Sequence, residues 1–253
     1  MKWFATATRD DDARKAAEVP AGSRIYAVGD IHGCLDLLRE LHEVITDDAV
    51  RHAGKRLMLV YLGDYVDRGG QSFEVIDALV HEPLPSFEIV HLKGNHEDLM
   101  LRFIEHGEYG ETWLFNGGGA TLTSYGLDGF GHFGAGADLP TLRRELENAL
   151  PASHWAFLGG LSLTHREGDY LFVHAGLRPG VPLDQQTEKD LVWIREPFLG
   201  ADEDFGCVVV HGHTPSFAPV VRPNRVCIDT HAYASGTLTC LVLEGAKRTF
   251  LHT

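Results

Sequence analysis

Carboxylate, imidazole and amide side chains follow several predicted strands at the point where each strand ends. Residues 56–62 form an apolar, β-branched run that predicts a buried strand. It ends in Gly63-Asp64-Tyr65-Val66-Asp67-Arg68-Gly69, which places two carboxylates and one guanidinium between glycines that permit tight turns. Ligands of open α/β sheets bind at the carboxyl ends of strands, so this loop is a candidate site. Asp and Gly are also common turn residues, and a purely structural turn is the alternative for this segment alone.

The same pattern occurs at four further predicted strand ends, which weakens the purely structural alternative. In chain order the five ends carry Asp30 and His32, Asp64, Asn95 and His96, His174, and His213. Such a mixture of oxygen and imidazole ligands favours Mn, Fe or Zn over Ca or Mg, which prefer oxygen ligands alone. The set is too large for one tetrahedral site and suffices for two ions that share a bridging carboxylate. That arrangement acidifies a water molecule for phosphoester hydrolysis.

The first three of these strand ends belong to three consecutive units, each a strand followed by a polar turn and a helix. The strands are expected at 24–28, 56–62 and 87–92, and each is followed by apolar residues at helical spacing. Ser72 is expected to be the N-cap of the second helix. This alternation predicts an α/β fold with a mostly parallel central sheet and right-handed crossovers.

The middle and the end of the chain have different patterns. Residues 107–158 are rich in glycine and have no strand pattern, and Leu142 and Leu146 indicate a helix. We expect a small helical cap insertion there, which would shape substrate access. A hairpin is expected from strands 161–165 and 170–174. A short helix is expected at 187–196. Further strands are expected at 207–210, 226–229, 238–243 and 247–251.

Length and composition restrict the class of protein. The 253 residues suit one α/β domain, and 44% hydrophobic with 23% charged residues is typical of a soluble globular protein. We expect residues 1–22 to form a loosely held arm and 23–253 a single domain. Charged residues occur too close to the start of the chain for the apolar core of a signal peptide, and no apolar run is long enough for a membrane span. The four cysteines form no Cys-x-x-Cys pair, which favours free thiols in a reducing cytoplasm.

The charge of the chain bears on its partners. A formal net charge of −14 argues against a nucleic-acid partner, which would need a basic surface. It does not exclude a phosphate substrate, because divalent ions invert the local charge of a site. We therefore expect neither a nucleic-acid nor a membrane partner.

Five short sequence motifs at the predicted strand ends occur in a characteristic order. They are Gly29-Asp30-Ile31-His32-Gly33, residues 63–69, Gly94-Asn95-His96-Glu97, His174-Ala175-Gly176 and Gly212-His213-Thr214. Together they resemble the signature of the phosphoprotein phosphatase family of metallophosphoesterases, and most closely its bacterial and lambda-phage branch. Residues 116–119, 193–196 and 228–230 also resemble that branch. The resemblance covers about Arg24 to Glu244 and implies a β-sandwich of mixed sheets flanked by helices.

The resemblance implies a role for each matching residue. The implied metal ligands are Asp30 and His32 for one ion, Asp64 as the bridge, and Asn95, His174 and His213 for the other. His96 resembles the general acid that protonates the leaving oxygen, and Asp67 would hydrogen-bond His96 and hold it in its cationic form. Arg68 and Arg195 would clamp phosphate oxygens, with Asn95 beside them. The implied cofactors are two divalent ions, with manganese as the first choice and iron or zinc as alternatives.

Two residues depart from the pattern of that branch. Lys93 stands where the phage-type enzyme has Arg, which leaves its contact with phosphate open. His231 stands where the branch usually has Gly, so we expect an altered loop with a left-handed backbone there. A ligand role for His231 is a less favoured alternative. His211 precedes the Gly-His-Thr block, but the pattern selects His213, and the remaining histidines are expected to be structural or solvated.

The resemblance implies a metal-dependent phosphomonoesterase, and most closely a serine/threonine protein phosphatase. Its substrates would be phosphorylated proteins or peptides, and small phosphomonoesters in vitro. A dinucleoside tetraphosphate hydrolase on the same scaffold is the first alternative, because a fold does not fix the substrate. A non-catalytic module that binds phosphorylated partners is the second, and the complete set of ligand and acid residues argues against it. The physiological substrate, the metal and the oligomeric state stay open.

Overall fold

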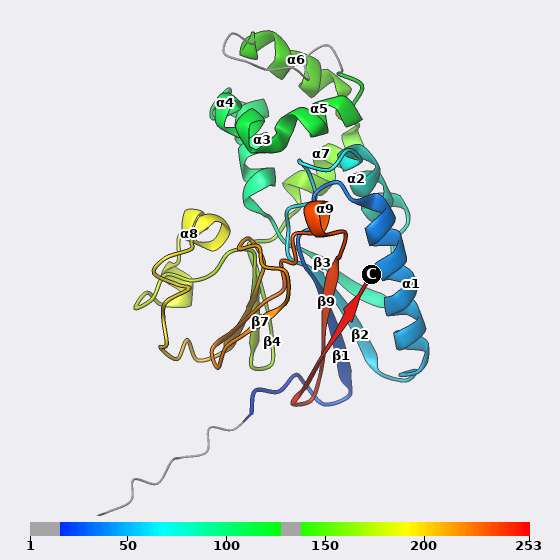
Figure 1. The fold of residues 1–253 in the computed structure, drawn as a ribbon, viewed down its shortest axis with the longest axis vertical. Helices are drawn as coiled ribbons and strands as arrows, with labels where there is room; N and C mark the ends of the chain where they lie inside the picture. Colours follow the sequence, from blue (N-terminus) through cyan, green and yellow to red (C-terminus); the bar gives the residue numbers. More distant parts are fainter. Residues whose placement is uncertain (1–15, 128–137) are drawn as a thin grey trace, which may run out of the picture.

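The computed structural model describes residues 16–127 and 138–253, which form two five-stranded sheets flanked by helices (Figure 1). The first sheet has the order β10 (Lys247–His252), β9 (Thr239–Glu244), β1 (Ser23–Val28), β2 (Arg56–Tyr61) and β3 (Phe87–His91). The second has the order β4 (Thr164–Glu167), β5 (Tyr170–Val173), β6 (Val208–His211), β8 (Arg225–Cys227) and β7 (Val220–Val221). This architecture confirms the expected α/β class and the sandwich of mixed sheets.

The central strands of the first sheet, β9, β1 and most of β2, are buried on both faces. β1, β2 and β3 run parallel, as the repeated strand–turn–helix units predict, and β9 and β10 join them in antiparallel pairs. Ile25 and Ala27 lie in the core between the two sheets, together with Phe172 of the second sheet. Tyr26 and Val28 point the opposite way, into the core under the helices. Burial on both faces explains why these strands are almost continuously apolar.

Helices cover the outer face of the first sheet and one end of the sandwich. Figure 1 shows α1 beside the first sheet, α8 beside the second, and α3 to α7 gathered above one end of both. The helices are α1 (Leu35–Val50), α2 (Ser72–His81), α3 (Asn95–His106), α4 (Gly110–Trp113), the π-helical η1 (Leu114–Gly118), α5 (Gly119–Ser124), α6 (Leu139–Ala149), α7 (Ala152–Gly159), the 3₁₀ turn η3 (Leu183–Gln185), α8 (Glu188–Trp193) and α9 (Ala232–Ser235).

The region expected to form a cap is helical in its described part. It holds α4, η1, α5, α6 and α7, whereas the sequence pattern indicated one helix near Leu142. Residues 128–137 of this region lie outside the described residues, as do residues 1–15 of the expected arm. The division into an arm, one domain and a cap insertion stays a prediction.

Two local predictions are wrong. The hairpin strand expected at 161–165 is β4 at Thr164–Glu167, because Arg166 and Glu167 pair with β5 and leave a tighter turn. Ser162 instead exchanges backbone hydrogen bonds with the end of β3. Ser72 is the first residue of α2 and does not cap it, because its hydroxyl accepts the backbone N–H of Asp67 at 3.0 Å.

Candidate metal centre

The predicted site residues meet at one end of the sandwich. They follow the carboxyl ends of parallel strands, with β1, β2 and β3 from the first sheet and β5 and β6 from the second. The side chains concerned are all buried: Asp30, His32, Asp64, Asp67, Asn95, His96, His174 and His213. Asp30 and His213, which are 183 positions apart in the chain, are therefore in contact.

Asp64 lies at the centre of this cluster. Its Oδ2 is 3.5 Å from Nε2 of His32, and its Oδ1 is 3.4 Å from Nε2 of His174. Two buried groups, each with ligand atoms within 4.8 Å of one another, share Asp64: one contains His32 and His96, and the other contains His174 and His213. A carboxylate with a different imidazole at each oxygen is well placed to bridge two ions, the role that the resemblance implies.

Asn95 and Asp30 approach the cluster in different ways. Asn95 Oδ1 lies 2.7 Å from Nδ1 of His213 and 3.0 Å from Nε2 of His174, beside both histidines expected to share its ion. Asp30 belongs to neither of the two groups found among the described residues. Its Oδ2 accepts the backbone N–H of His213 at 3.0 Å. Asp30 therefore meets the cluster through the loop that carries His213.

Backbone carbonyls orient the two imidazoles beside Asp64. Nδ1 of His32 donates to the carbonyl oxygen of Val66 at 2.9 Å, and Nδ1 of His174 donates to that of Leu62 at 2.8 Å. A carbonyl can only accept, so Nδ1 carries the hydrogen in both rings. In the neutral ring, the lone pair on Nε2 then faces Asp64, and this orientation by backbone groups is typical of metal-ligating histidines.

The electrostatics of the cluster fit a divalent cation. Burial lowers the pKa of His32 to about 3 and that of His213 to about 2, so both rings are neutral, which is the form that binds metals. Burial, together with the negative charges of Asp229 and Asp64, raises the pKa of Asp30 well above its usual value. Neutral imidazoles next to crowded, buried carboxylates form a donor set that a divalent cation would complete.

Asp67 and His96 form the expected hydrogen bond, with Asp67 Oδ2 2.6 Å from His96 Nδ1. Trp113 Nε1 and Thr121 Oγ1 also donate to the Asp67 carboxylate, at 3.0 and 2.6 Å. Burial acts to lower the pKa of His96, but the charges of Asp64 and Asp67 outweigh it, and the net pKa is raised. The pair thus favours a cationic His96 with Nε2 directed at the cluster, as a general acid requires. The acid role itself stays a prediction.

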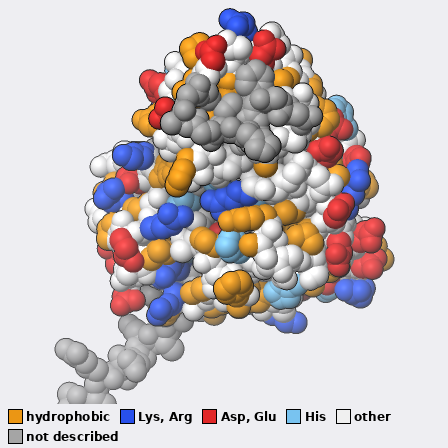
Figure 2. Space-filling model, turned by 45° about the horizontal axis from the view of Figure 1, so that its top comes forward, with side chains coloured by type: hydrophobic (Ala, Val, Ile, Leu, Met, Phe, Trp, Pro, Cys, Tyr) orange, Lys and Arg blue, Asp and Glu red, His pale blue; other side chains and the backbone are white. Residues whose placement is uncertain are grey.

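The two expected phosphate-binding arginines both reach the cluster. Arg68 Nη2 lies 3.2 Å from Nε2 of His96, and Arg195 Nη2 donates to the carbonyl oxygen of His213 at 3.1 Å. Lys93 is turned aside, because its ammonium pairs with Asp98 and Glu188. Figure 2 shows basic side chains gathered near the middle of one face, although the chain as a whole is acidic. This local concentration of positive charge suits a phosphate substrate.

His231 and His211 lie near the centre but in neither group of potential ligands. The backbone of His231 is left-handed, with φ 60° and ψ 44°, a conformation that glycine adopts readily; the altered loop expected here stays a prediction. Its Nε2 lies 2.7 Å from the hydroxyl of Tyr233, whose ring in turn stacks under the guanidinium of Arg68. His211 is buried, and its Nδ1 bonds the carbonyl of Gly212.

Several supporting residues were not predicted. The buried carboxylate of Glu97 accepts four backbone N–H groups, from Gly94, Asp64, Tyr65 and Val66. Glu97 lies three residues after the N-cap of α3 and accepts its N–H, which is half of a capping box, but the N-cap residue Gly94 has no side chain to complete that motif. Trp113, Thr121 and Tyr233 were missed as well, and no local motif marks them, whereas Asp229 lies in the block 228–230 but was given no role.

The loops of the site have unusual backbone geometry. Several of their residues adopt positive φ without being glycine: His32, Asp64, Asp67, Arg68 and His213. Such conformations cost about 1–3 kcal/mol each and persist where surrounding contacts enforce them, which is common at active sites. One enforcing contact is the backbone bond from Gly69 N to the carbonyl of His32, at 3.0 Å.

Comparison with known proteins agrees with this geometry. Residues 23–236 match the Calcineurin-like phosphoesterase family. An asymmetrical bis(5'-nucleosyl)-tetraphosphatase, PrpE of Anoxybacillus flavithermus, is 28% identical over 85% of this chain and 88% of its own. Serine/threonine-protein phosphatase 1 of Salmonella typhimurium is 28% identical over 91% of this chain and 97% of its own. The crystal structure of a candidate diadenosine tetraphosphatase has a TM-score of 0.64 at 20% identity and covers 93% of this chain and 98% of its own, which supports the fold.

The protein belongs to the Calcineurin-like phosphoesterase family, whose match spans most of the chain, from the first strand to α9. The resemblance drawn from the sequence motifs is thereby confirmed, and the protein is a hydrolase of the metallophosphoesterase type. No helix of residues 16–127 and 138–253 is long and apolar enough to cross a membrane.

Proposed function

We propose that this protein hydrolyses dinucleoside tetraphosphates in a reaction that depends on divalent metal ions. The observation that carries the proposal is the position of Asp64 between two buried groups of imidazoles, with the hydrogen-bonded pair of His96 and Asp67 on one side. This is an arrangement suited to the cleavage of a phosphate ester or anhydride.

The residues of the cluster would hold two metal ions. Asp30, His32 and Asp64 would hold one ion, and Asp64, Asn95, His174 and His213 the other. When bound, divalent ions supply Lewis-acid polarisation of the phosphoryl group and acidify water at neutral pH. We expect manganese first, with iron and zinc as alternatives, because the donor set mixes oxygen and nitrogen.

The chain's own groups would complete the reaction. Asp67 accepts the Nδ1 hydrogen of His96 at 2.6 Å and favours the cationic ring, in which Nε2 also carries a proton that His96 would deliver to the leaving oxygen. Arg68 and Arg195 would bind non-bridging phosphate oxygens and stabilise the negative charge of the transferring group. Trp113 and Thr121 hold Asp67 in place by donating to its carboxylate.

The choice of a dinucleotide substrate rests on the relatives. Several relatives that align along 85% of this chain are named bis(5'-nucleosyl)-tetraphosphatases. This reverses the order of the two enzymatic hypotheses drawn from the sequence. The protein phosphatase remains the second candidate function, because the Salmonella phosphatase aligns along 91% of this chain and 97% of its own length. We expect either activity to be cytoplasmic.

A substrate panel tests the proposal. The purified protein, loaded in turn with manganese, iron and zinc, is assayed with diadenosine tetraphosphate, a phosphothreonine peptide and p-nitrophenyl phosphate. The proposal predicts the highest kcat/KM for diadenosine tetraphosphate. A higher kcat/KM for the phosphopeptide would support the protein phosphatase instead, and binding without any hydrolysis would support a non-catalytic module.

A further inference from the structure

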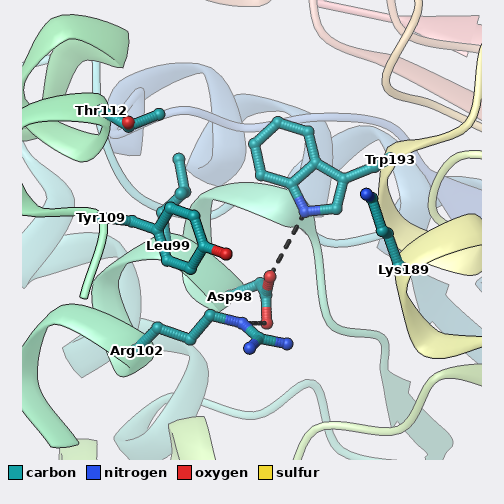
Figure 3. A pocket seen from close by; sticks show the side chains of 7 residues that line it. All are labelled: Asp98, Leu99, Arg102, Tyr109, Thr112, Lys189 and Trp193. Carbon is teal, nitrogen blue, oxygen red and sulfur yellow. Dashed lines mark hydrogen bonds and ion pairs between the residues drawn. The ribbon is translucent and has the colours of Figure 1, made fainter. Parts of the chain in front are cut away.

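We propose that a pocket between α3, α4 and α8 binds the nucleobase of the substrate, with Tyr109 and Trp193 as its aromatic walls. This inference rests on the proposed function and deepens it, because it assigns a place outside the metal centre to the nucleoside. The pocket has a volume of about 380 Å³, within the range of small-molecule sites. Figure 3 shows its lining side chains from close by.

The walls of the pocket suit a flat aromatic ring. Tyr109 and Trp193 come from opposite sides of the pocket, and Leu99 of α3 also lines it (Figure 3). The side chain of Tyr109 is 54% exposed although it is large and aromatic, and Trp193 is half-buried. A base between two aromatic side chains gains stacking energy at each face, whichever base it is.

Polar groups at the edge of the pocket add to this fit. Asp98 is buried and accepts from Trp193 Nε1 at 3.3 Å and from Arg102 Nε at 3.0 Å, and it also pairs with Lys93. A carboxylate has about four acceptor positions, so one remains for the exocyclic amine of a base. Arg102 and Lys189 place positive charge in the same pocket.

The pocket is linked to the metal centre through the helices α3 and α8. Asn95 and His96 begin α3, and Leu99 lies one helical turn further on, a rise of about 6 Å. At the other wall, the carbonyl oxygen of Trp193 lies 3.2 Å from Nε2 of His213, and the two rings are 6.2 Å apart. A nucleotide with a phosphate at the centre would thus need to extend only a short way to reach the pocket.

Tyr109, one wall of the pocket, is also linked to the metal centre. The backbone N–H of Trp113 donates to the carbonyl oxygen of Tyr109 at 2.8 Å, and the Trp113 indole donates to Asp67. Tyr109 itself has a left-handed backbone, with φ 58°, which is uncommon for a bulky residue. The short helix α4 therefore places an exposed aromatic ring on one side and a partner of the general-acid pair on the other.

A binding experiment tests the pocket directly. Protein with ¹⁵N-labelled tryptophan is titrated, without added metal, with adenosine 5'-monophosphate, and the indole N–H resonance of Trp193 is followed by NMR after assignment with Trp193→Phe. Ribose 5-phosphate is the matched control, because it has the same sugar phosphate and no base. We expect the resonance to shift with adenosine 5'-monophosphate and to move clearly less with ribose 5-phosphate. Equal shifts for both, no shift, or a shift caused only by a phosphothreonine peptide would overturn the proposal.

A kinetic experiment separates binding of the nucleobase from the hydrolytic step. Tyr109→Ala is expected to lower the ratio of kcat/KM for diadenosine tetraphosphate to kcat/KM for p-nitrophenyl phosphate by about 5- to 150-fold, the effect of one lost stacking contact. Tyr109→Phe keeps the ring and should keep the ratio. Hydrolysis of diadenosine tetraphosphate with an unchanged ratio in Tyr109→Ala would refute the pocket and leave the proposed function intact. Absence of that hydrolysis in the unsubstituted protein would refute the proposed function itself.

Discussion

At the residue scale, the site depends on how His96 is held. Its Nδ1 bonds Asp67, and the Asp67 carboxylate is fixed by donors from Trp113 and Thr121. Three donors on one buried carboxylate leave it little freedom to rotate, so the imidazole keeps one orientation. A fixed orientation within reach of the leaving oxygen is what the general-acid role expected of His96 requires.

Replacement of His96 by Asn tests its role as the acid. Asn cannot protonate a leaving oxygen, so kcat is expected to fall by about 10²- to 10⁴-fold on a substrate with a poor leaving group. The loss should be smaller on p-nitrophenyl phosphate, whose leaving group needs little protonation. Metal content measured by atomic spectrometry should stay unchanged. Full activity of the variant on the poor leaving group would contradict the assignment.

The sequence located these residues but not their backbone conformation. Each candidate follows a strand and sits in a Gly-polar turn, and this pattern placed Asp64, Asn95 and His213 at strand ends, which the two sheets bring to one end of the sandwich. The left-handed φ of Asp64 and His213 is enforced by contacts between loops distant in the chain, which no local pattern contains. The same applies to Trp113 and Thr121, whose contact with Asp67 depends on how the cap region packs.

At the element scale, the start of α3 organises the centre. Gly94 is the N-cap residue, Asn95 and His96 occupy the first turn, and Glu97 accepts the backbone N–H groups of the Asp64 loop. The helix and the loop after β2 therefore form one unit. This unit needs close approach of the two backbones, because a Cβ at Gly94 would overlap the carboxylate and the backbone nitrogen of Asp64.

Gly94→Ala is expected to disrupt the centre. The added methyl must displace Asp64, so we expect lost metal binding in calorimetric titration with Mn²⁺ and a destabilisation of about 1–3 kcal/mol in urea unfolding. Gly70→Ala is the matched control in the neighbouring loop, because a Cβ there meets nothing within 4 Å. It should change stability by no more than about 0.5 kcal/mol. Unimpaired metal binding by Gly94→Ala would contradict the close packing described.

Sequence patterns predicted which elements form better than they predicted where the elements begin. The three strand–turn–helix units are present as predicted, because their periodicity reflects burial on both faces of the first sheet. β4 begins three residues later than expected, since Ser162 pairs with the end of β3 and not with β5. Ser72 resembles an N-cap by sequence, yet tertiary contact with the Asp67 loop takes its hydroxyl.

At the scale of the whole molecule, an ionic network joins α1, β1 and β9. Asp48 of α1 accepts from Arg24 of β1 at 2.7 Å and from the hydroxyl of Tyr26 at 2.7 Å. Arg24 also pairs with Glu244 of β9 at 2.6 Å. The network thus ties the first helix to two strands of the first sheet.

This network predicts the pH dependence of stability. Burial acts to raise the pKa of Asp48, but its hydrogen bonds from Tyr26 and Arg24 outweigh it, and the net pKa is lowered. A carboxyl with a lowered folded-state pKa stabilises the fold above its unfolded pKa, about 3.9, and loses that contribution as the pH falls through the folded value. Asp48→Asn should therefore cost about 1.5–3 kcal/mol at pH 7 and progressively less below pH 4.

Urea unfolding at pH 7, 5 and 3 measures this dependence. Asp47→Asn is the control, because Asp47 is an exposed neighbour on the same helix, and it should leave stability almost unchanged. An equal destabilisation by Asp48→Asn at all three pH values would show that the charge of Asp48 is not what stabilises the network.

The whole molecule also explains why the centre needs both sheets. The loops after β1, β2 and β3 bring Asp64 and its neighbours, and the loops after β5 and β6 bring His174 and His213. The central claim is that these two halves hold two divalent ions on either side of Asp64. The most direct measurement is an anomalous difference map from crystals of the protein soaked in MnCl₂. We predict two peaks, one beside His32 and one beside His174 and His213, with Asp64 between them; a single peak, or peaks away from Asp64, would contradict the claim.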